Sequence, residues 1–135
     1  MKILPLICYE IIYTGKIFTN NEFDYIVELL TESMADWDLA LKAFNSVEKC
    51  QISIDNTTNE DLKIDYQKLM TVSKQLSDVH ANSVIIATSY ICLVAKNNFE
   101  HLDTIRASLE EISQVKQLVR DNTEYIKKSI SLKYQ

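Results

Sequence analysis

Glycine and proline are almost absent from this chain of 135 residues, and both occur near its start, as Pro5 and Gly15. An average chain of this length would carry about nine glycines and about seven prolines. Glycine supplies the positive φ angles and the close backbone approach that sharp turns and phosphate-binding loops need. Residues 16–135 therefore predict long helices joined by short polar links, and they exclude glycine-rich phosphate loops.

Hydrophobic spacing and turn residues divide the first half of the chain. A helix is expected after Thr19, and a second helix is expected to begin near Asp36. Residues 51–59 are rich in Asn, Thr and Asp, which compete for backbone hydrogen bonds, and they are predicted to form a loop. A capping box from Thr57 to Glu60 is expected to start the next helix.

Residues 60–96 could form one continuous helix of about 55 Å, at about 1.5 Å per residue. Its second half, residues 84–95, is apolar nearly all round, which is typical of the central helix of a bundle. A bend is predicted near residues 78–82, because a compact domain of this size can hardly hold so long a rod. Asn97 and Asn98 are expected to end the helix.

The sharpest repeat lies in the last predicted helix, residues 99–129. Isoleucine or valine recurs there every seven residues, at Ile105, Ile112, Val119 and Ile126. Such a heptad is typical of antiparallel bundle packing or of a coiled coil. The companion positions include a lysine and a threonine, so packing inside the bundle is favoured over self-dimerisation. If the companion positions are not filled internally, these four residues are the expected partner-binding surface.

The patterns together predict a single domain, residues 1–135, of the mainly α class. We expect a bundle of four or five helices over residues 36–130. The structure of the N-terminal segment, residues 1–31, is left open before the helix expected after Thr19, and the apolar residues 3–8 could form a short strand. A domain of this length buries about two-thirds of the surface of its unfolded chain, so an independent core is feasible.

The charge balance is acidic, with 14 Lys and Arg against 19 Asp and Glu and a net charge of −5. An acidic protein is disfavoured as a nucleic-acid binder, and only the basic C-terminal turn offers that alternative. Three cysteines without CxxC spacing are typical of a reducing compartment, so a cytoplasmic protein is expected. No transmembrane segment is expected, because the apolar run 83–95 is shorter than the about 17–25 residues of a span.

The sequence offers no metal-binding or acid–base constellation. His80 and His101 are the only histidines, and neither belongs to a Glu-x-x-His or His-Glu-x-x-His pattern. His80 is expected at the predicted bend, satisfied by a helix end, and His101 is expected to be exposed. Tyr90 is expected in the core. No metal and no cofactor are therefore predicted.

Residues 4–15 read LPLICYEIIYTG. They resemble the strand and nucleophile elbow of the nitrilase-type domain of apolipoprotein N-acyltransferase, in which a cysteine is followed by Tyr-Glu. Residues 22–31 loosely resemble the next strand of that domain. The cysteine of that family forms a thioester with the acyl group. The resemblance therefore implies that Cys8 is a nucleophile and Glu10 a supporting carboxylate.

The resemblance covers residues 1–31 only. Family members take a general-base Glu and a Lys from earlier in the domain, whereas seven residues precede Cys8 here. An elbow without its base and its oxyanion donors is not a working site. The alternative function is thus an inactive remnant or fragment of a thiol acyltransferase, against the simpler interpretation of Cys8 as a buried small hydrophobe.

The remaining features favour a non-enzymatic interaction protein. Long amphipathic helices with an acidic balance are suited to presenting a helical groove or an acidic face. The expected partner is another protein or a second copy of the chain.

Overall fold

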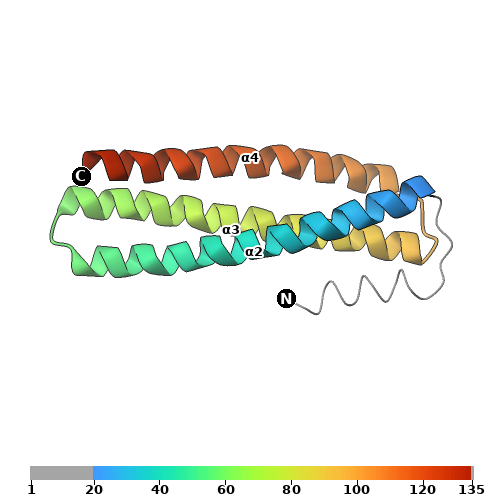
Figure 1. Cartoon of the computed structure of the whole chain (residues 1–135), viewed down its shortest axis with the longest axis horizontal. Coiled ribbons are helices and arrows are strands. Elements are labelled where there is room, and N and C mark those ends of the chain that lie inside the picture. Colours follow the sequence, from blue (N-terminus) through green and yellow to red (C-terminus); the bar gives the residue numbers. More distant parts are fainter. Residues whose placement is uncertain (1–19, 135) are drawn as a thin grey trace. The chain divides into compact units, whose positions relative to one another are not determined.

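The computed structural model describes residues 20–134, which form three α-helices and, within that range, no strand. Helix α2 spans Asn20–Asn56, α3 spans Glu60–Ala95 and α4 spans Leu102–Lys133 (Figure 1). The described residues are an all-α three-helix bundle, so the predicted number of four or five helices is wrong. The predicted N-terminal strand lies outside the described residues.

Two predicted interruptions are absent because nothing in the backbone forces them. The helices expected on either side of residues 31–36 are one helix, since α2 contains neither glycine nor proline. α2 also continues through most of the predicted loop 51–59 and leaves only residues 57–59 non-helical. The bend predicted near residues 78–82 does not interrupt α3, which is helical throughout.

The link between α2 and α3 is closed by asparagine. The Oδ1 atom of Asn59 accepts a hydrogen bond from the backbone N–H of Leu62 at 3.2 Å, which makes Asn59 the N-cap of α3. The Oγ1 atom of Thr57 accepts from the N–H of Asn59, also at 3.2 Å. The predicted capping box from Thr57 to Glu60 is therefore wrong, and the helix begins two residues later than that pattern implied.

The end of α3 confirms the prediction made for Asn97 and Asn98. Asn97 has a φ of 57°, in the left-handed region that usually favours glycine. The N–H of Asn98 donates to the carbonyl of Leu93 at 2.9 Å, and the N–H of Asn97 donates to the carbonyl of Val94 at 3.0 Å. This pair of bonds is a Schellman motif, built without glycine because asparagine tolerates the left-handed conformation.

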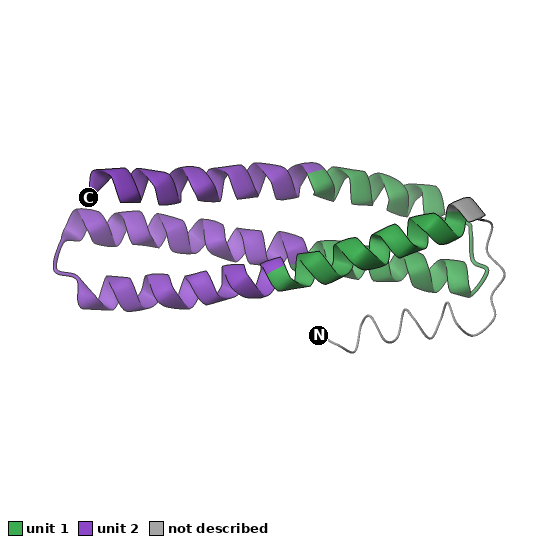
Figure 2. Cartoon of the chain, viewed as in Figure 1, with its two compact units in different colours: residues 1–38, 81–113 green, residues 39–80, 114–135 purple. Residues whose placement is uncertain are grey.

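The three helices are shared between two compact units, coloured green and purple in Figure 2. Among the described residues, unit 1 holds 20–38 and 81–113, and unit 2 holds 39–80 and 114–134. Each unit therefore contains one segment of α2, one of α3 and one of α4. The expectation of one domain over residues 1–135 stays a prediction.

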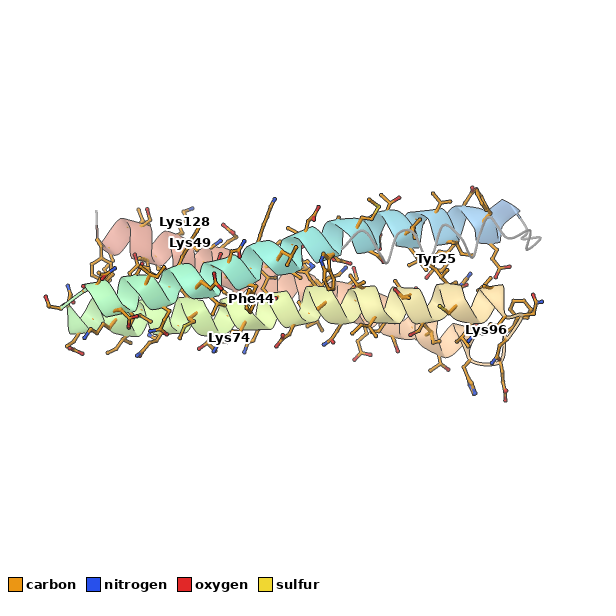
Figure 3. All side chains as sticks on the ribbon, turned by 90° about the horizontal axis from the view of Figure 1, so that it is seen from below. Tyr25, Phe44, Lys49, Lys74, Lys96 and Lys128 are labelled. Carbon is orange, nitrogen blue, oxygen red and sulfur yellow. The ribbon has the colours of Figure 1, made fainter. Side chains whose placement is uncertain are left out.

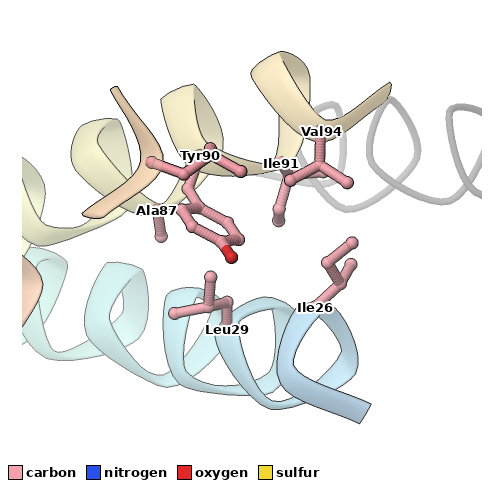
Figure 4. Packing of buried hydrophobic residues seen from close by; sticks show 7 residues of the cluster. Ile26, Leu29, Ala87, Tyr90, Ile91 and Val94 are labelled. Carbon is pink, nitrogen blue, oxygen red and sulfur yellow. The ribbon is translucent and has the colours of Figure 1, made fainter. Parts of the chain in front are cut away.

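Unit 1 contains the larger hydrophobic cluster. Tyr90 is 1% exposed and confirms its expected place in the core, with its ring projecting from α3 toward Leu29 of α2 (Figure 4). Side chains from all three helices complete the cluster. The prediction that residues 84–95 form a central helix buried all round is wrong, because Ile85 is 62% exposed and α3 is one of three helices that share the core. The buried members are Ile26, Leu29, Ala87, Tyr90, Ile91, Val94 and Leu102.

Unit 2 has the smaller hydrophobic cluster. Its hydrophobic cluster consists of Cys50, Leu69 and Val72, with partly buried hydrophobics of α3 and α4 packed against it. Three polar side chains are also buried in this unit, namely Ser73, His80 and Thr123, and three are buried in unit 1, namely Ser33, Asp36 and Ser83. The hydroxyl of Thr123 donates to the carbonyl of Val119 at 2.8 Å, whereas Ser73 Oγ has no hydrogen-bond partner among the described residues.

Candidate functional site

The predicted partner-binding residues of α4 are all half-buried. Ile105 packs against the core of unit 1, and Ile126 packs against the core of unit 2. Ile112 and Val119 have the same intermediate exposure. Their role in binding a partner stays a prediction, and a different face of α4 offers much more apolar surface.

A second heptad on α4 faces solvent in unit 2. Leu118, Tyr125 and Leu132 recur every seven residues and are 70%, 72% and 66% exposed. They are the three most exposed large hydrophobic side chains among the described residues. Val115, 41% exposed, lies about one helical turn before Leu118 and extends the row. We call Val115, Leu118, Tyr125 and Leu132 the outer stripe.

Polar side chains occupy the gaps and one edge of the outer stripe. Asn122 and Ser129 lie between its apolar members and are exposed. Asp121 and Lys128 lie along one edge, again seven residues apart and exposed (Lys128 is labelled in Figure 3). Gln117 Nε2 donates to Asp121 Oδ1 at 2.8 Å and helps to fix that carboxylate beside the stripe.

A shallow hollow of about 620 Å³ lies next to the ring of Tyr125. Its lining combines the ring with both signs of charge, which is the composition of a polar interface rim around an apolar centre. The lining residues are Asp121, Glu124, Tyr125, Lys127, Lys128 and Ser131.

Unit 1 carries a separate cluster of two tyrosines and an arginine, one from each helix. The rings of Tyr25 and Tyr90 meet edge to face, with centroids 5.1 Å apart and an interplanar angle of 79°. The Arg106 guanidinium carbon lies 4.4 Å from the centroid of the Tyr25 ring, and Arg106 Nε donates to the Tyr90 hydroxyl at 2.9 Å. Because the arginine is occupied by both rings, this cluster fastens the three helix segments together.

Electrostatics at this cluster agree with a structural role. Burial raises the pKa of the Tyr25 phenol, and the neighbouring Arg106 acts in the opposite direction. The hydrogen bond to the Tyr90 hydroxyl raises the pKa of Arg106, so its charge is held at every ordinary pH. A hollow of about 520 Å³ beside the cluster is lined by both acidic and aromatic side chains.

The described thiols are packing residues. Cys50 is buried, and burial raises the pKa of its thiol despite the opposing charge of Lys127. A raised pKa lowers the thiolate fraction on which cysteine nucleophiles depend. Cys92 is half-buried on α3. Cys8 and Glu10, the pair that resembles the acyltransferase elbow, lie outside the described residues.

The two histidines lie in different environments. His80 is fully buried inside α3 and not at a helix end, because α3 continues without interruption through this position. His101 is exposed just before α4, as expected. Across the described part of the chain, no group of three or more His, Cys, Asp or Glu side chains could hold a metal ion.

Helix α3 is long and apolar enough to satisfy a simple test for a membrane span. An 18-residue window within it reaches a mean hydropathy of 1.3, and half of that window is buried in the structure. A largely buried core helix passes the same test, so this observation is weak. The expectation of no transmembrane segment stays a prediction.

Comparison with protein-family models, curated proteins and solved structures finds no match for this chain. The outer stripe and its surroundings are therefore the features of the molecule that bear on its function. Sequence periodicity contained this stripe, since Leu118, Tyr125 and Leu132 share one heptad position. The stronger isoleucine heptad concealed it.

Proposed function

We propose that this protein is a non-enzymatic helical interaction protein that docks another protein along the outer stripe of α4. The observation that carries the proposal is the gathering of the three most exposed large hydrophobics on one helical face. Single exposed hydrophobics are ordinary on protein surfaces, whereas a row of them along one face of a helix favours docking against a partner helix.

The spacing of the stripe defines the kind of partner. Side chains at 115, 118, 125 and 132 follow the three- and seven-residue intervals by which one helix packs along another. The polar residues along its edge supply register, because charged groups at such positions set partner choice and orientation. A helix of the partner is therefore the element expected to lie on α4.

Site-specific photocrosslinking tests this function. A benzophenone amino acid replaces Tyr125, and, as a matched control, the exposed aromatic Phe44 of α2, which is 55% exposed (Figure 3). We expect protein adducts at position 125 on irradiation in cells and little at position 44. A second change, Leu132→Glu, should remove the adduct at 125. Equal adducts at both positions, or an adduct that survives Leu132→Glu, would contradict the proposal.

A further inference from the structure

We propose that the partner seated on the outer stripe is the outer stripe of a second copy of this chain, with the two α4 helices antiparallel. The inference rests on the proposed function and names its partner. It is drawn from three features of α4 that agree with one another: the arrangement of apolar residues, the polar pair at the centre and the charges along the edge.

The two ends of the stripe are complementary when one helix is reversed, and its two inner residues, Leu118 and Tyr125, meet polar residues. The stripe runs from Val115 to Leu132, so its midpoint lies between residues 123 and 124. Reversal about that point sets Val115 opposite Leu132 of the second copy and Leu118 opposite Ser129. Each contact then occurs twice, which is the property of a twofold interface.

The same reversal pairs the two polar groups at the centre. Asn122 comes to lie opposite Tyr125 of the second copy, where the amide and the phenol hydroxyl can each donate and accept a hydrogen bond. Tyr125 is 72% exposed in the single chain, so its hydroxyl is available for this contact. A polar residue at one core position of a helix pair fixes register and strand number at some cost in stability.

The edge charges have nearly the same centre as the stripe. The midpoint of Asp121 and Lys128 lies between residues 124 and 125, one residue or about 1.5 Å along the helix from the midpoint of the stripe. Antiparallel pairing brings Asp121 of each copy toward Lys128 of the other and forms two ion pairs. In a parallel pair in register, Asp121 of one copy lies at the same height as Asp121 of the other, and Lys128 at the same height as Lys128. The two ion pairs then do not form.

The size of the contact sets its strength. The stripe covers about 26 Å of one helix, at about 1.5 Å per residue. Such a contact is smaller than the about 800 Å² per partner of a standard stable interface. We therefore expect a reversible dimer with a dissociation constant on the order of 10 μM.

Charge exchange with sedimentation velocity tests the register directly. The full chain should show a monomer–dimer equilibrium across a range of about 1 to 200 μM. Asp121→Lys and Lys128→Asp should each raise the dissociation constant at least tenfold, because each variant sets two pairs of like charges together. An equimolar mixture of the two variants should dimerise again, since one variant then supplies two lysines and the other two aspartates.

Control variants separate the stripe from general changes in charge or size. Asp78→Lys and Lys74→Asp make the same charge changes at exposed positions of α3 in unit 2 and should dimerise like the wild type. Tyr125→Ala should weaken the dimer, and Phe44→Ala on α2 should not. Circular dichroism of each variant shows whether the helices are retained.

Three outcomes would overturn the inference. A full chain that is monomeric at every concentration excludes the second copy as partner. A dimer that persists unchanged in both single charge variants excludes the antiparallel register, as does a mixture that fails to restore association. Photocrosslinking at position 125 separates the failure of the dimer from the failure of the proposed function. If another protein occupies the stripe, adducts at position 125 still form. If nothing occupies it, no adducts form.

Discussion

Units 1 and 2 are built from segments of the same three helices but differ in what fills them. Unit 1 has a cluster of seven buried hydrophobics, fastened by Arg106 between two tyrosines. Unit 2 has three buried hydrophobics in its cluster. Each unit also buries three polar side chains, which are Ser33, Asp36 and Ser83 in unit 1 and Ser73, His80 and Thr123 in unit 2. Of these, Ser73 has a hydroxyl with no hydrogen-bond partner among the described residues. Because apolar burial stabilises by about 25 cal/mol per Å² and an unpaired buried hydroxyl destabilises, unit 2 is expected to open at the lower free energy.

Helices that are continuous along their length can therefore pack differently in their two halves. The outer stripe lies in unit 2, the unit with the smaller hydrophobic cluster. A partner that covers the stripe adds buried apolar surface there. Binding and local stability are therefore expected to be linked in unit 2 and independent in unit 1.

The largest effect is expected in the core of unit 1. Tyr90→Ala should reduce the free energy of unfolding by about 3–5 kcal/mol, because it leaves a cavity and removes the acceptor of the Arg106 bond. Tyr90→Phe, which removes only the hydroxyl, should cost about 1 kcal/mol. Urea denaturation measures both. A larger loss for Val72→Ala in unit 2 than for the matched Val94→Ala in unit 1 would contradict the proposed difference.

The contacts of Arg106 should contribute less to the free energy of unfolding than the hydrophobic core of unit 1 does. Arg106→Ala removes one hydrogen bond and the contact with the Tyr25 ring, and should cost about 1–2 kcal/mol. Arg106→Lys should recover less than half of that loss, since a lysine lacks the planar guanidinium that stacks and donates together. Full recovery with lysine, measured by the same denaturation, would show that charge alone matters there.

Much of the fold could be predicted from the sequence because few residues interrupt it. The scarcity of glycine and proline indicated a mainly α chain. The apolar residues 84–95 supply four of the seven members of the unit 1 cluster, but Ile85 is exposed, so this segment is not buried on every side. The end of α3 at Asn97 was also predictable, since only asparagine could adopt the left-handed conformation there. These predictions depend on the conformational preferences of individual residues, which follow from the residue type alone.

The number of helices could not be predicted because polar residues permit a break without requiring one. Thr31 lies where a break was expected, yet its hydroxyl donates to the carbonyl of Val27 at 2.9 Å and stays within the helix. Thr57 and Asn59 are both competent N-caps, and only the structure shows that Asn59 is used. Such alternatives differ by about 1 kcal/mol or less.

The candidate site could be predicted only in part. Periodicity identified α4 as the helix with a heptad, but α4 carries two heptads on different faces. Val119 and Leu118 are neighbours in sequence, and packing against α2 and α3 decides which of them is half-buried. The partner surface proposed here is thus the face that the stronger heptad leaves exposed.

Removal of an unpaired hydroxyl should stabilise unit 2. Ser73→Ala deletes a buried oxygen that has no hydrogen-bond partner among the described residues, and should raise the free energy of unfolding by about 1 kcal/mol. Ser131→Ala, at an exposed position of α4, changes helix propensity alone and should gain about 0.5 kcal/mol or less. Thermal and urea denaturation compare the two variants. A loss of stability in Ser73→Ala would contradict the expected stabilisation.

The smallest effect is expected at the far end of α4. The Tyr134 hydroxyl and the Lys133 ammonium donate to Asp65 Oδ2 at 2.9 Å and 3.2 Å, and they lower the pKa of Asp65 below its ordinary 3.8. A carboxyl with a lowered folded-state pKa stabilises the fold above its unfolded pKa, and this contribution is lost as the pH falls through the folded-state value.

Stability should therefore decrease as the pH falls below about 4, and Asp65→Asn should reduce that slope. Asp78→Asn, at an exposed position on α3, provides the control for loss of one negative charge. Denaturation midpoints measured between about pH 2 and pH 6 give both profiles. Identical slopes for wild type and Asp65→Asn would show that the contact with Tyr134 and Lys133 does not form in solution.

Hydrogen exchange at two protein concentrations tests whether α4 pairs with itself through the outer stripe, since it reports the two units separately within one chain. If α4 pairs with itself through the outer stripe, raising the concentration through the dissociation constant should slow amide exchange in residues 114–133. Exchange in residues 102–113, the part of α4 in unit 1, should stay the same. No change with concentration, or equal slowing in both parts of α4, would contradict the account.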